Sequence, residues 1–410
     1  MSVRVLVVDD SALMRQMISR FLGEAGMEVC GTARDGVEGL EKARALRPDV
    51  ITLDVQMPRM DGLTMLARLM EEMPTPVVMV SSVTQRQAPA AVEALMLGAV
   101  DVVAKPGGAI SVNLGEVRDE LVAKVRAAAH ARVRPRRGRA RLRTEPGDKP
   151  VPGAPADKPA PGRTAVRPPR GPAETAAAAE PLQGTAQAAA QRVPGLPTAP
   201  EPPASPPVRG TAPGPAPVVV GSSTGGPSAL SSLMSQLPAD FPRPVIIVQH
   251  MPEGFTASLA RRLDSLSPLS VAEAEPGRVP KPGEAWVARG GQHLVFDPEG
   301  RMVLSSAAPH LGVRPAVDLT LESAVDVWGG DVVAVILTGM GMDGARGARK
   351  LKRAGGRVLA QDEATSVVYG MPRVVAELKL ADEVHALSDM AAALVRAVGA
   401  AAGTDAGGSR

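Results

Sequence analysis

One segment divides this chain into two folding units. Residues 128–216 consist mainly of proline, alanine, glycine and arginine and show neither helical nor strand periodicity. Such a segment cannot bury enough apolar surface to offset the entropy lost on ordering it, so we expect it to be disordered. A flexible coil of this length has a root-mean-square span of roughly 50–60 Å. We therefore predict two domains, residues 1–127 and 217–399, joined by a long linker, with a mobile tail over residues 400–410.

The overall composition limits the class of protein. The 410 residues are 44% hydrophobic and carry a formal net charge of +3, which suits two ordinary globular cores. Much of the basic excess lies in the arginine run at residues 132–143, where it keeps the linker solvated, so nucleic acid is not an expected partner. No apolar run approaches the ~20 residues of a membrane span, and the lone Cys30 fits a reducing compartment. We expect a cytoplasmic monomer.

Short apolar runs alternate with amphipathic stretches in both domains. Examples are "VRVLVV", "DVITLDV" and "VDVVAKP" in the first domain and "PVVVG", "PVIIVQH" and "DVVAVILTG" in the second. Strands of this length separated by helical stretches are typical of a parallel sheet with helices on both faces. The second domain also contains a strand-rich insert with "EAWVARG", "HLVFD" and "MVLSS". The predicted fold class is α/β, with two doubly wound, largely parallel-sheet domains.

Polar side chains stand where the strands of the first domain end. Asp9 and Asp10 follow the first apolar run, Asp54 ends the third, Ser81 the fourth and Lys105 the fifth. Open α/β sheets bind ligands at the carboxyl ends of their strands. Three carboxylates converging there repel one another and suit a hard cation such as Mg²⁺. A shielded aspartate can then attack a phosphodonor, leaving an acyl phosphate whose oxygens a lysine and a hydroxyl would contact.

The segments "DVQMPRMDG" and "AKP" resemble those of the receiver domains of two-component response regulators. The resemblance covers residues 1–127 and implies that a histidine kinase phosphorylates Asp54. It further implies Mg²⁺ ligands at Asp9, Asp10, Asp54 and the backbone carbonyl of Gln56, a switch hydroxyl at Ser81 and a phosphate partner at Lys105.

In the second domain, "VVVGSSTGGPSAL" at residues 218–230 runs from a strand through a glycine-rich turn into a helix. Gly221, Ser223 and Gly225 fit the pattern G-x-S-x-G, in which a sharp turn exposes a serine beside a helix N-terminus. A glycine-rich phosphate cradle looks similar, but the lysine of a P-loop is missing.

A serine nucleophile needs a base and an acid. Of the five histidines, only His250 directly follows an apolar strand, one strand–helix unit beyond the serine. The acid has two candidates, Asp343 after "VVAVILTGMGM" and Asp362 after "GRVLAQ". The glycines around Asp343 favour it, because they allow close backbone approach and offer amides for an oxyanion hole. The order Ser, His, Asp argues against an ordinary α/β-hydrolase.

The segments "GSSTGGP", "QHMPEGFTASLARRL" and "ILTGMGMDGA" resemble those of the catalytic domain of chemotaxis protein-glutamate methylesterases. The resemblance implies Ser223, rather than Ser222, as nucleophile, His250 as base and Asp343 as orienting acid. It also implies active-site support from Thr224 and from the backbone amide of Met340, the latter for the oxyanion.

That family hydrolyses methyl esters of glutamates on chemoreceptors, releases methanol and deamidates receptor glutamines, with no cofactor for the hydrolysis. The resemblance therefore implies methylated chemoreceptors as substrates, a histidine kinase of the chemotaxis pathway as activator, and a contact between receiver and catalytic domain that inhibits the enzyme. Because the tether is long, any such contact must be encoded in the domain surfaces. The alternative is a response regulator whose second domain only binds a partner or metabolite.

Overall fold

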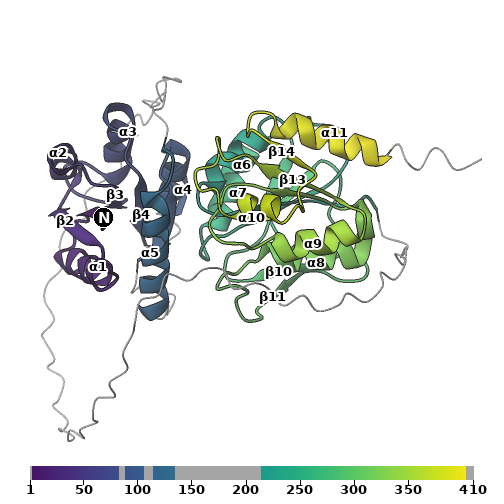
Figure 1. The fold of residues 1–410 in the computed structure, drawn as a ribbon, viewed down its shortest axis with the longest axis horizontal. Helices are drawn as coiled ribbons and strands as arrows, with labels where there is room; N and C mark the ends of the chain where they lie inside the picture. Colours follow the sequence, from purple (N-terminus) through teal and green to yellow (C-terminus); the bar gives the residue numbers. More distant parts are fainter. Residues whose placement is uncertain (1, 83–87, 106–113, 134–213, 403–410) are drawn as a thin grey trace, which may run out of the picture. The chain divides into compact units, whose positions relative to one another are not determined.

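A computed structural model describes residues 2–82, 88–105, 114–133 and 214–402, and all of them belong to one compact unit of the chain. The predicted linker at 128–216 falls mostly outside the described residues, as does most of the predicted tail at 400–410 (Figure 1). None of the described helices is long and apolar enough to cross a bilayer.

The first domain is a five-stranded parallel sheet with the strand order β2-β1-β3-β4-β5. Its strands are β1 (Arg4–Val8), β2 (Glu28–Ala33), β3 (Val50–Asp54), β4 (Val77–Ser81) and β5 (Asp101–Ala104), and its helices are α1 (Ala12–Glu24), α2 (Gly36–Leu46), α3 (Gly62–Glu72), α4 (Ala88–Leu97) and α5 (Leu114–Ala129). Acidic or hydroxyl side chains begin three of these helices: Ser11, Asp35 and Asp61 accept hydrogen bonds from first-turn amides of α1, α2 and α3.

The second domain is a seven-stranded sheet with the order β14-β13-β12-β6-β7-β9-β8, in which every strand pair is parallel. Its strands are β6 (Val218–Ser222), β7 (Val245–Gln249), β8 (Ser270–Glu273), β9 (Glu284–Val287), β12 (Val333–Ile336), β13 (Arg357–Gln361) and β14 (Glu383–His385). Its α-helices are α6 (Gly226–Met234), α7 (Thr256–Asp264), α8 (Val317–Trp328), α9 (Ala345–Arg353), α10 (Met371–Glu377) and α11 (Met390–Ala402). These findings confirm the predicted fold class of two largely parallel α/β sheets.

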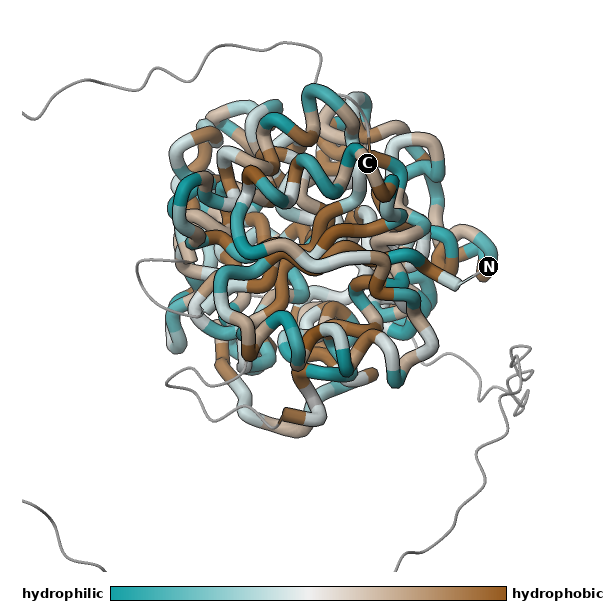
Figure 2. The backbone as a smooth tube through the Cα atoms, turned by 90° about the vertical axis from the view of Figure 1, so that its left-hand side faces the viewer, coloured by the Kyte–Doolittle hydropathy of each residue, from teal (hydrophilic) through white to brown (hydrophobic). Residues whose placement is uncertain are grey.

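The strand-rich insert divides its strands between two sheets. β9 joins the main sheet, whereas β10 (His293–Phe296) and β11 (Met302–Ser305) form a separate antiparallel pair. Residues of the central strands, such as Val218 in β6, Ile246 in β7 and Val335 in β12, are completely buried. In the tube coloured by hydropathy, the hydrophobic segments gather in the interior and the hydrophilic segments lie mainly at the periphery (Figure 2).

The strand order places a switch point inside each sheet. In the second domain the chain runs from β6 to β7 on one side, and β12 later pairs with β6 on the other side. In the first domain, β1 lies between β2 and β3 in the same way. Ligands of open α/β sheets bind outside the carboxyl ends of the strands at such points. The loops that follow β6, β7 and β12, and those that follow β1 and β3, are therefore where functional side chains are expected.

Candidate active site and phosphorylation site

Two adjacent serines lie where β6 turns into α6. Ser222, the last residue of β6, is completely buried, and its hydroxyl donates to Oε1 of Gln249 at 2.7 Å. Ser223 is buried but keeps 9% of its area exposed, and its hydroxyl joins none of the hydrogen bonds found among the described residues. Of the two serines, Ser223 is the one with a hydroxyl free to react.

Glycines shape the turn around Ser223. Gly225 has a φ of +78°, in the left-handed region where a side chain is strained. A Cβ on Gly226 would collide with the side-chain oxygen of Gln249, and a Cβ on Gly339 would lie 2.8 Å from Cβ of Ser223. The loop after β12 therefore approaches the serine more closely than any residue with a side chain would permit.

His250 lies at the end of β7, the strand next to β6. Its amide donates to the carbonyl of Ser222 at 3.0 Å, which continues the pairing of the two strands to the site. Its ring Nε2 lies 2.8 Å from Oδ2 of Asp343. With Nε2–H held by the carboxylate, Nδ1 is the ring nitrogen left to accept a proton.

Asp343 is a buried carboxylate that the fold holds ionised. It follows β12, and it accepts backbone N–H bonds from Val317 at 2.6 Å, from Asp318 at 2.9 Å and from Gly344 at 2.9 Å. Burial by itself would raise the pKa of Asp343, but the hydrogen bond and charge of His250 and the amides at the start of α8 outweigh it and lower the pKa below its usual range. The structure thus places an ionised acid against the imidazole.

Asp362, the other candidate acid, serves a turn instead. It follows β13, one strand farther from β6 than β12. Its Oδ1 accepts the amide of Thr365 at 2.9 Å and the hydroxyl of the same residue. The structure brings Asp343, and not Asp362, to His250.

The acidic cluster of the first domain also assembles. Carboxylate oxygens of Asp9, Asp10 and Asp54 lie within 4.8 Å of one another. Nζ of Lys105 lies 2.8 Å from Oδ2 of Asp9 and 2.7 Å from Oδ2 of Asp54. Three carboxylates with hard oxygen donors at one sheet edge fit Mg²⁺, which prefers such ligands.

The carboxylates and the lysine of this cluster shift one another's pKa values. Burial and the neighbouring charge of Asp9 raise the pKa of Asp54, although the ammonium of Lys105 counteracts them. Burial tends to lower the pKa of Lys105, but its bonds to the two aspartates outweigh that effect and raise it. A cation bound here would relieve the repulsion between the carboxylates.

The remaining predicted receiver residues flank the cluster. Ser81 is completely buried at the end of β4, and its hydroxyl points to the carbonyl of Ser82 at 3.5 Å. Gln56 is exposed, two residues after Asp54. Gly62 packs against the Asp54 backbone so tightly that a Cβ would collide with the Asp54 carbonyl oxygen, which accounts for the glycine in "MDG".

Two family models match this chain, one in each α/β sheet domain. Residues 218–394 match the family model described as CheB methylesterase, and residues 5–112 match the response regulator receiver domain. A protein-glutamate methylesterase/protein-glutamine glutaminase of Symbiobacterium thermophilum is 46% identical over 97% of this chain and 97% of its own. A protein of the same name from Geobacillus kaustophilus is 42% identical over 97% of this chain and 99% of its own.

The chain belongs to the CheB methylesterase family. Among solved structures, the methylesterase catalytic domain of Thermotoga maritima CheB is 46% identical and covers 44% of this chain and 98% of that one, with a TM-score of 0.44. The response regulator domain of the same protein is 45% identical and covers 32% of this chain and 99% of that one, with a TM-score of 0.30.

The two residues predicted to support the methylesterase site come from two loops: Thr224 directly follows Ser223, and Met340 lies in the loop after β12. The Met340 side chain is 39% exposed on the loop after β12, and its backbone amide donates to no carbonyl among the described residues. Thr224 is buried, and its carbonyl accepts a hydrogen bond from the Thr338 hydroxyl at 3.0 Å. Its own hydroxyl donates to Oδ2 of Asp101 in β5 at 2.5 Å.

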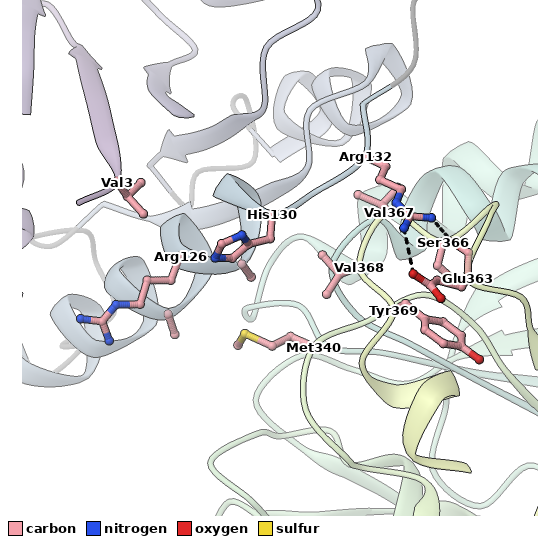
Figure 3. A pocket seen from close by; sticks show the side chains of 12 residues that line it. Val3, Arg126, His130, Arg132, Met340, Glu363, Ser366, Val367, Val368 and Tyr369 are labelled. Carbon is pink, nitrogen blue, oxygen red and sulfur yellow. Dashed lines mark hydrogen bonds and ion pairs between the residues drawn. The ribbon is translucent and has the colours of Figure 1, made fainter. Parts of the chain in front are cut away.

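Asp101 is one of several receiver groups that contact the methylesterase domain within the compact unit. The amide of Gly225 donates to the carbonyl of Val100 at 3.0 Å, directly beside the Thr224 contact. Met340 and Arg126 both line a pocket of about 810 Å³ (Figure 3). In this pocket Arg132 Nη2 donates to Glu363 Oε1 at 2.8 Å. The contacts of Asp101 and Val100 therefore reach Thr224 and Gly225, the two residues that follow the proposed nucleophile.

Gln249 is a further residue of the site, which its sequence pattern did not indicate. Its side chain is 2% exposed, and its Nε2 donates to the carbonyls of Ser223 and His250, each at 2.9 Å. The available signal was an amide side chain at the last position of a strand that is otherwise apolar, "VIIVQ". A polar group at a buried position needs partners, and here the partners are the backbones that carry the proposed nucleophile and base.

Proposed function

We propose that this chain hydrolyses the methyl esters of glutamate side chains on chemoreceptors, with Ser223 as nucleophile, His250 as base and Asp343 as the acid that orients it. The observation that carries the proposal is the 2.8 Å bond between His250 Nε2 and the buried carboxylate of Asp343, at the end of the strand next to Ser223. The names of the full-length relatives support the same activity.

Each residue of the proposed triad has a separate role in the reaction. His250 Nδ1 takes the proton of the Ser223 hydroxyl as its oxygen attacks the ester carbonyl, and Asp343 stabilises the resulting imidazolium. The amide of Met340 donates to the tetrahedral oxyanion. His250 returns the proton to the departing methoxide, so that methanol leaves and an acyl-serine remains. Water then attacks the acyl-serine with His250 again as base, which regenerates Ser223 and leaves the glutamate carboxylate.

The same groups suit the deamidation of receptor glutamines, the second activity in the relatives' names. In that reaction His250 gives its proton to the departing ammonia instead of to methoxide. The water step is identical, and the product is again a glutamate.

We propose that a histidine kinase of the chemotaxis pathway phosphorylates Asp54. Asp9, Asp10, Asp54 and the backbone carbonyl of Gln56 would hold Mg²⁺, which neutralises the charge of the incoming phosphoryl group. Lys105 contacts Asp54, and Ser81 ends the neighbouring strand, which supports a role for both in binding a phosphoryl oxygen. Receiver modification then bears on the methylesterase site through the contacts of Asp101 with Thr224 and of Val100 with Gly225. The cytoplasmic location and the monomeric state remain predictions.

Methanol release from methylated receptor membranes tests the proposal directly. The full-length protein is assayed with and without a small-molecule phosphodonor, and the Ser223→Ala variant is the blank. Release that rises with the phosphodonor is expected. Release without stimulation would retain the esterase and overturn receiver control, whereas no release above the blank with a cognate receptor would overturn the esterase. The His250→Gln variant separates an esterase, which would lose activity, from a binding module, which would tolerate the change.

A further inference from the structure

A second histidine–carboxylate pair lies beside the proposed triad. His310 Nε2 lies 2.9 Å from Oδ2 of Asp318, and Asp318 is 1% exposed. Atoms of His310, Asp318 and Asp343 that are able to bind a proton or a metal lie within 4.8 Å of one another. The pair therefore shares one small buried volume with the acid of the triad.

The two aspartates cap each other's helices. Asp343 precedes α9, and its carboxylate accepts the first amides of α8, from Val317 and Asp318. Asp318 lies in the first turn of α8, and its Oδ1 accepts the amide of Gly347 in the first turn of α9 at 2.8 Å. A carboxylate at a helix N-terminus satisfies free amides and interacts favourably with the helix dipole. These crossed caps fix the orientation of Asp343 relative to α8.

All four carboxylate oxygens of this pair of aspartates accept hydrogen bonds from protein groups. Asp343 is surrounded by three amides and His250, and Asp318 by one amide and His310. No lone carboxylate oxygen is left facing a cavity, so the cluster is a hydrogen-bonded network and not a candidate metal site.

Two buried carboxylates so close together need a countercharge. Burial and the charge of Asp343 raise the pKa of Asp318 above its usual range, although the amide of Gly347 and the His310 ring counteract them. His310 faces this carboxylate directly, and a ring N–H donated to Oδ2 stabilises the ionised form of Asp318. The other charged or titratable groups near the cluster are His293 on β10 and Arg314 before α8. On α9, Arg346 is engaged by Glu322 of α8.

We propose that Asp318 is a positioning residue of the methylesterase site. It aligns Asp343 through the crossed caps, and as a carboxylate hydrogen-bonded to the His310 ring it adds a second negative charge behind the imidazolium of His250. The inference rests on the proposed triad. Its physical basis is that a second buried charge within a few ångströms stabilises the cation formed in the transition state.

The Asp318→Asn variant removes the charge and keeps an oxygen that accepts the Gly347 amide. We expect kcat for methanol release to fall about 5- to 30-fold with KM little changed, because the charge acts on the transition state. The acid limb of the kcat/KM–pH profile should move to lower pH by about half a unit to one unit, because a less stabilised imidazolium loses its proton more readily. His310→Gln should move it in the same direction, and the double variant should add little.

The matched control is His385→Gln. His385 on the edge strand β14 also pairs with a carboxylate, Glu383, through Nε2 at 2.7 Å, but it has no contact with the triad. Rates are expressed as the ratio of variant to wild type at each pH, so that effects on receiver phosphorylation cancel. Trp328 at the end of α8 reports by fluorescence whether the domain remains folded.

Each outcome separates the inference from the function on which it rests. A shifted acid limb in Asp318→Asn and His310→Gln, absent in His385→Gln, supports the positioning role. An unshifted profile with lower activity in step with lower stability would show a purely structural role and overturn the inference, while the methylesterase activity of the wild type stood. No methanol from the wild type above the Ser223→Ala blank would overturn the proposed function itself.

Discussion

The side-chain amide of Gln249 donates to the backbone carbonyl of Ser223 at 2.9 Å. The same nitrogen donates to the carbonyl of His250, and the side-chain oxygen accepts the hydroxyl of Ser222. One buried amide therefore ties the turn after β6 to the end of β7. The distance between the proposed nucleophile and base depends on this link as well as on the strand pairing.

Replacing Gln249 should damage catalysis more than binding. Gln249→Leu keeps the volume but leaves two buried carbonyls and one hydroxyl without their partner, at a cost of about 1–3 kcal/mol for each unsatisfied group. We expect kcat to fall about 10- to 100-fold with KM little changed, as measured by methanol release. Gln236→Leu is the control, because that amide bonds only to Ser232 on the exposed end of α6. Equal activity of the two variants would contradict the role given to Gln249.

Gly226→Ala tests the same link from the other side. The added Cβ would collide with the Gln249 side-chain oxygen, so either α6 or the amide must move. We expect the rate of methanol release to fall at least ten-fold, although the added methyl group does not touch the substrate. Gly23→Ala in α1 is the matched control, because nothing lies within 4 Å of its Cβ, and alanine there should stabilise the helix by about 0.5–1 kcal/mol. Full activity in Gly226→Ala would show that the turn tolerates the displacement.

Some residues of the proposed site can be predicted from their position after a strand, and others cannot. Ser223, His250 and Asp343 were predictable because each follows an apolar strand, and parallel strands deliver such positions to one edge. The choice between Asp343 and Asp362 could not come from strand position, since both follow strands. What separates them is the start of α8, whose amides bind Asp343, and that contact joins segments 26 residues apart.

The residues that sequence analysis missed act through long-range partners. In the sequence, Gln249 is the last residue of a strand and Asp318 lies at the start of a helix. Only the folded structure shows which groups their side chains bind by hydrogen bonds. The insert was predicted as strand-rich, but no local pattern states that β9 pairs with β7 in the main sheet while β10 pairs with β11. Strand partners depend on the packing of whole elements, which local periodicity does not encode.

Removing the proposed phosphorylation site should abolish stimulation and spare the basal rate. Asp54 lies in the receiver and contacts Lys105, so Asp54→Asn is expected to show no rise in methanol release with phosphodonor and an unstimulated rate near that of the wild type. Chelation of Mg²⁺ with EDTA should have the same effect on the wild type. Asp61→Asn is the control, because this exposed N-cap of α3 tolerates asparagine and should retain full stimulation. If Asp54→Asn were still stimulated by the phosphodonor, a residue other than Asp54 would be the phosphorylation site.

The contact between Asp101 and Thr224 should restrain the unstimulated enzyme. A hydrogen bond to a charged group contributes about 1.5–3 kcal/mol, so Asp101→Asn is expected to raise the rate without phosphodonor by up to about ten-fold and to reduce the stimulation ratio. Arg132→Gln is the control: the ion pair of Arg132 with Glu363 is more than half exposed on both sides and should contribute little. An unstimulated rate unchanged in Asp101→Asn would show that this contact does not hold the enzyme inactive.

Lys124 of α5 stabilises the charge of Asp101 from within the receiver. Its Nζ lies 3.1 Å from Asp101, 2.7 Å from Glu120 and 2.7 Å from the carbonyl of Val102. Burial tends to lower the pKa of Lys124, but the charges of Asp101 and Glu120 outweigh it and raise the pKa above the usual 10.5. The folded state therefore binds this proton more tightly than the unfolded state does.

The sign of the resulting pH dependence follows from that difference. The stabilisation is fully present below pH 10.5 and is lost as the pH rises through the higher folded-state pKa. Lys124→Met should lower the free energy of unfolding of the receiver by about 3 kcal/mol at pH 7 and pH 9, because it leaves Asp101 without its cation. The difference from the wild type should shrink at pH 11 and above.

The measurement must report on the receiver alone. Both tryptophans and the single tyrosine belong to the methylesterase domain, so fluorescence does not follow the receiver. Amide hydrogen exchange of β4 and β5 does, because these strands are buried beside Lys124. Arg118→Met on the same helix removes an exposed ion pair with Asp119 and should change protection very little. A loss of protection as large in Arg118→Met as in Lys124→Met would show that α5 responds to any lost cation, and that the buried contact with Asp101 contributes nothing of its own.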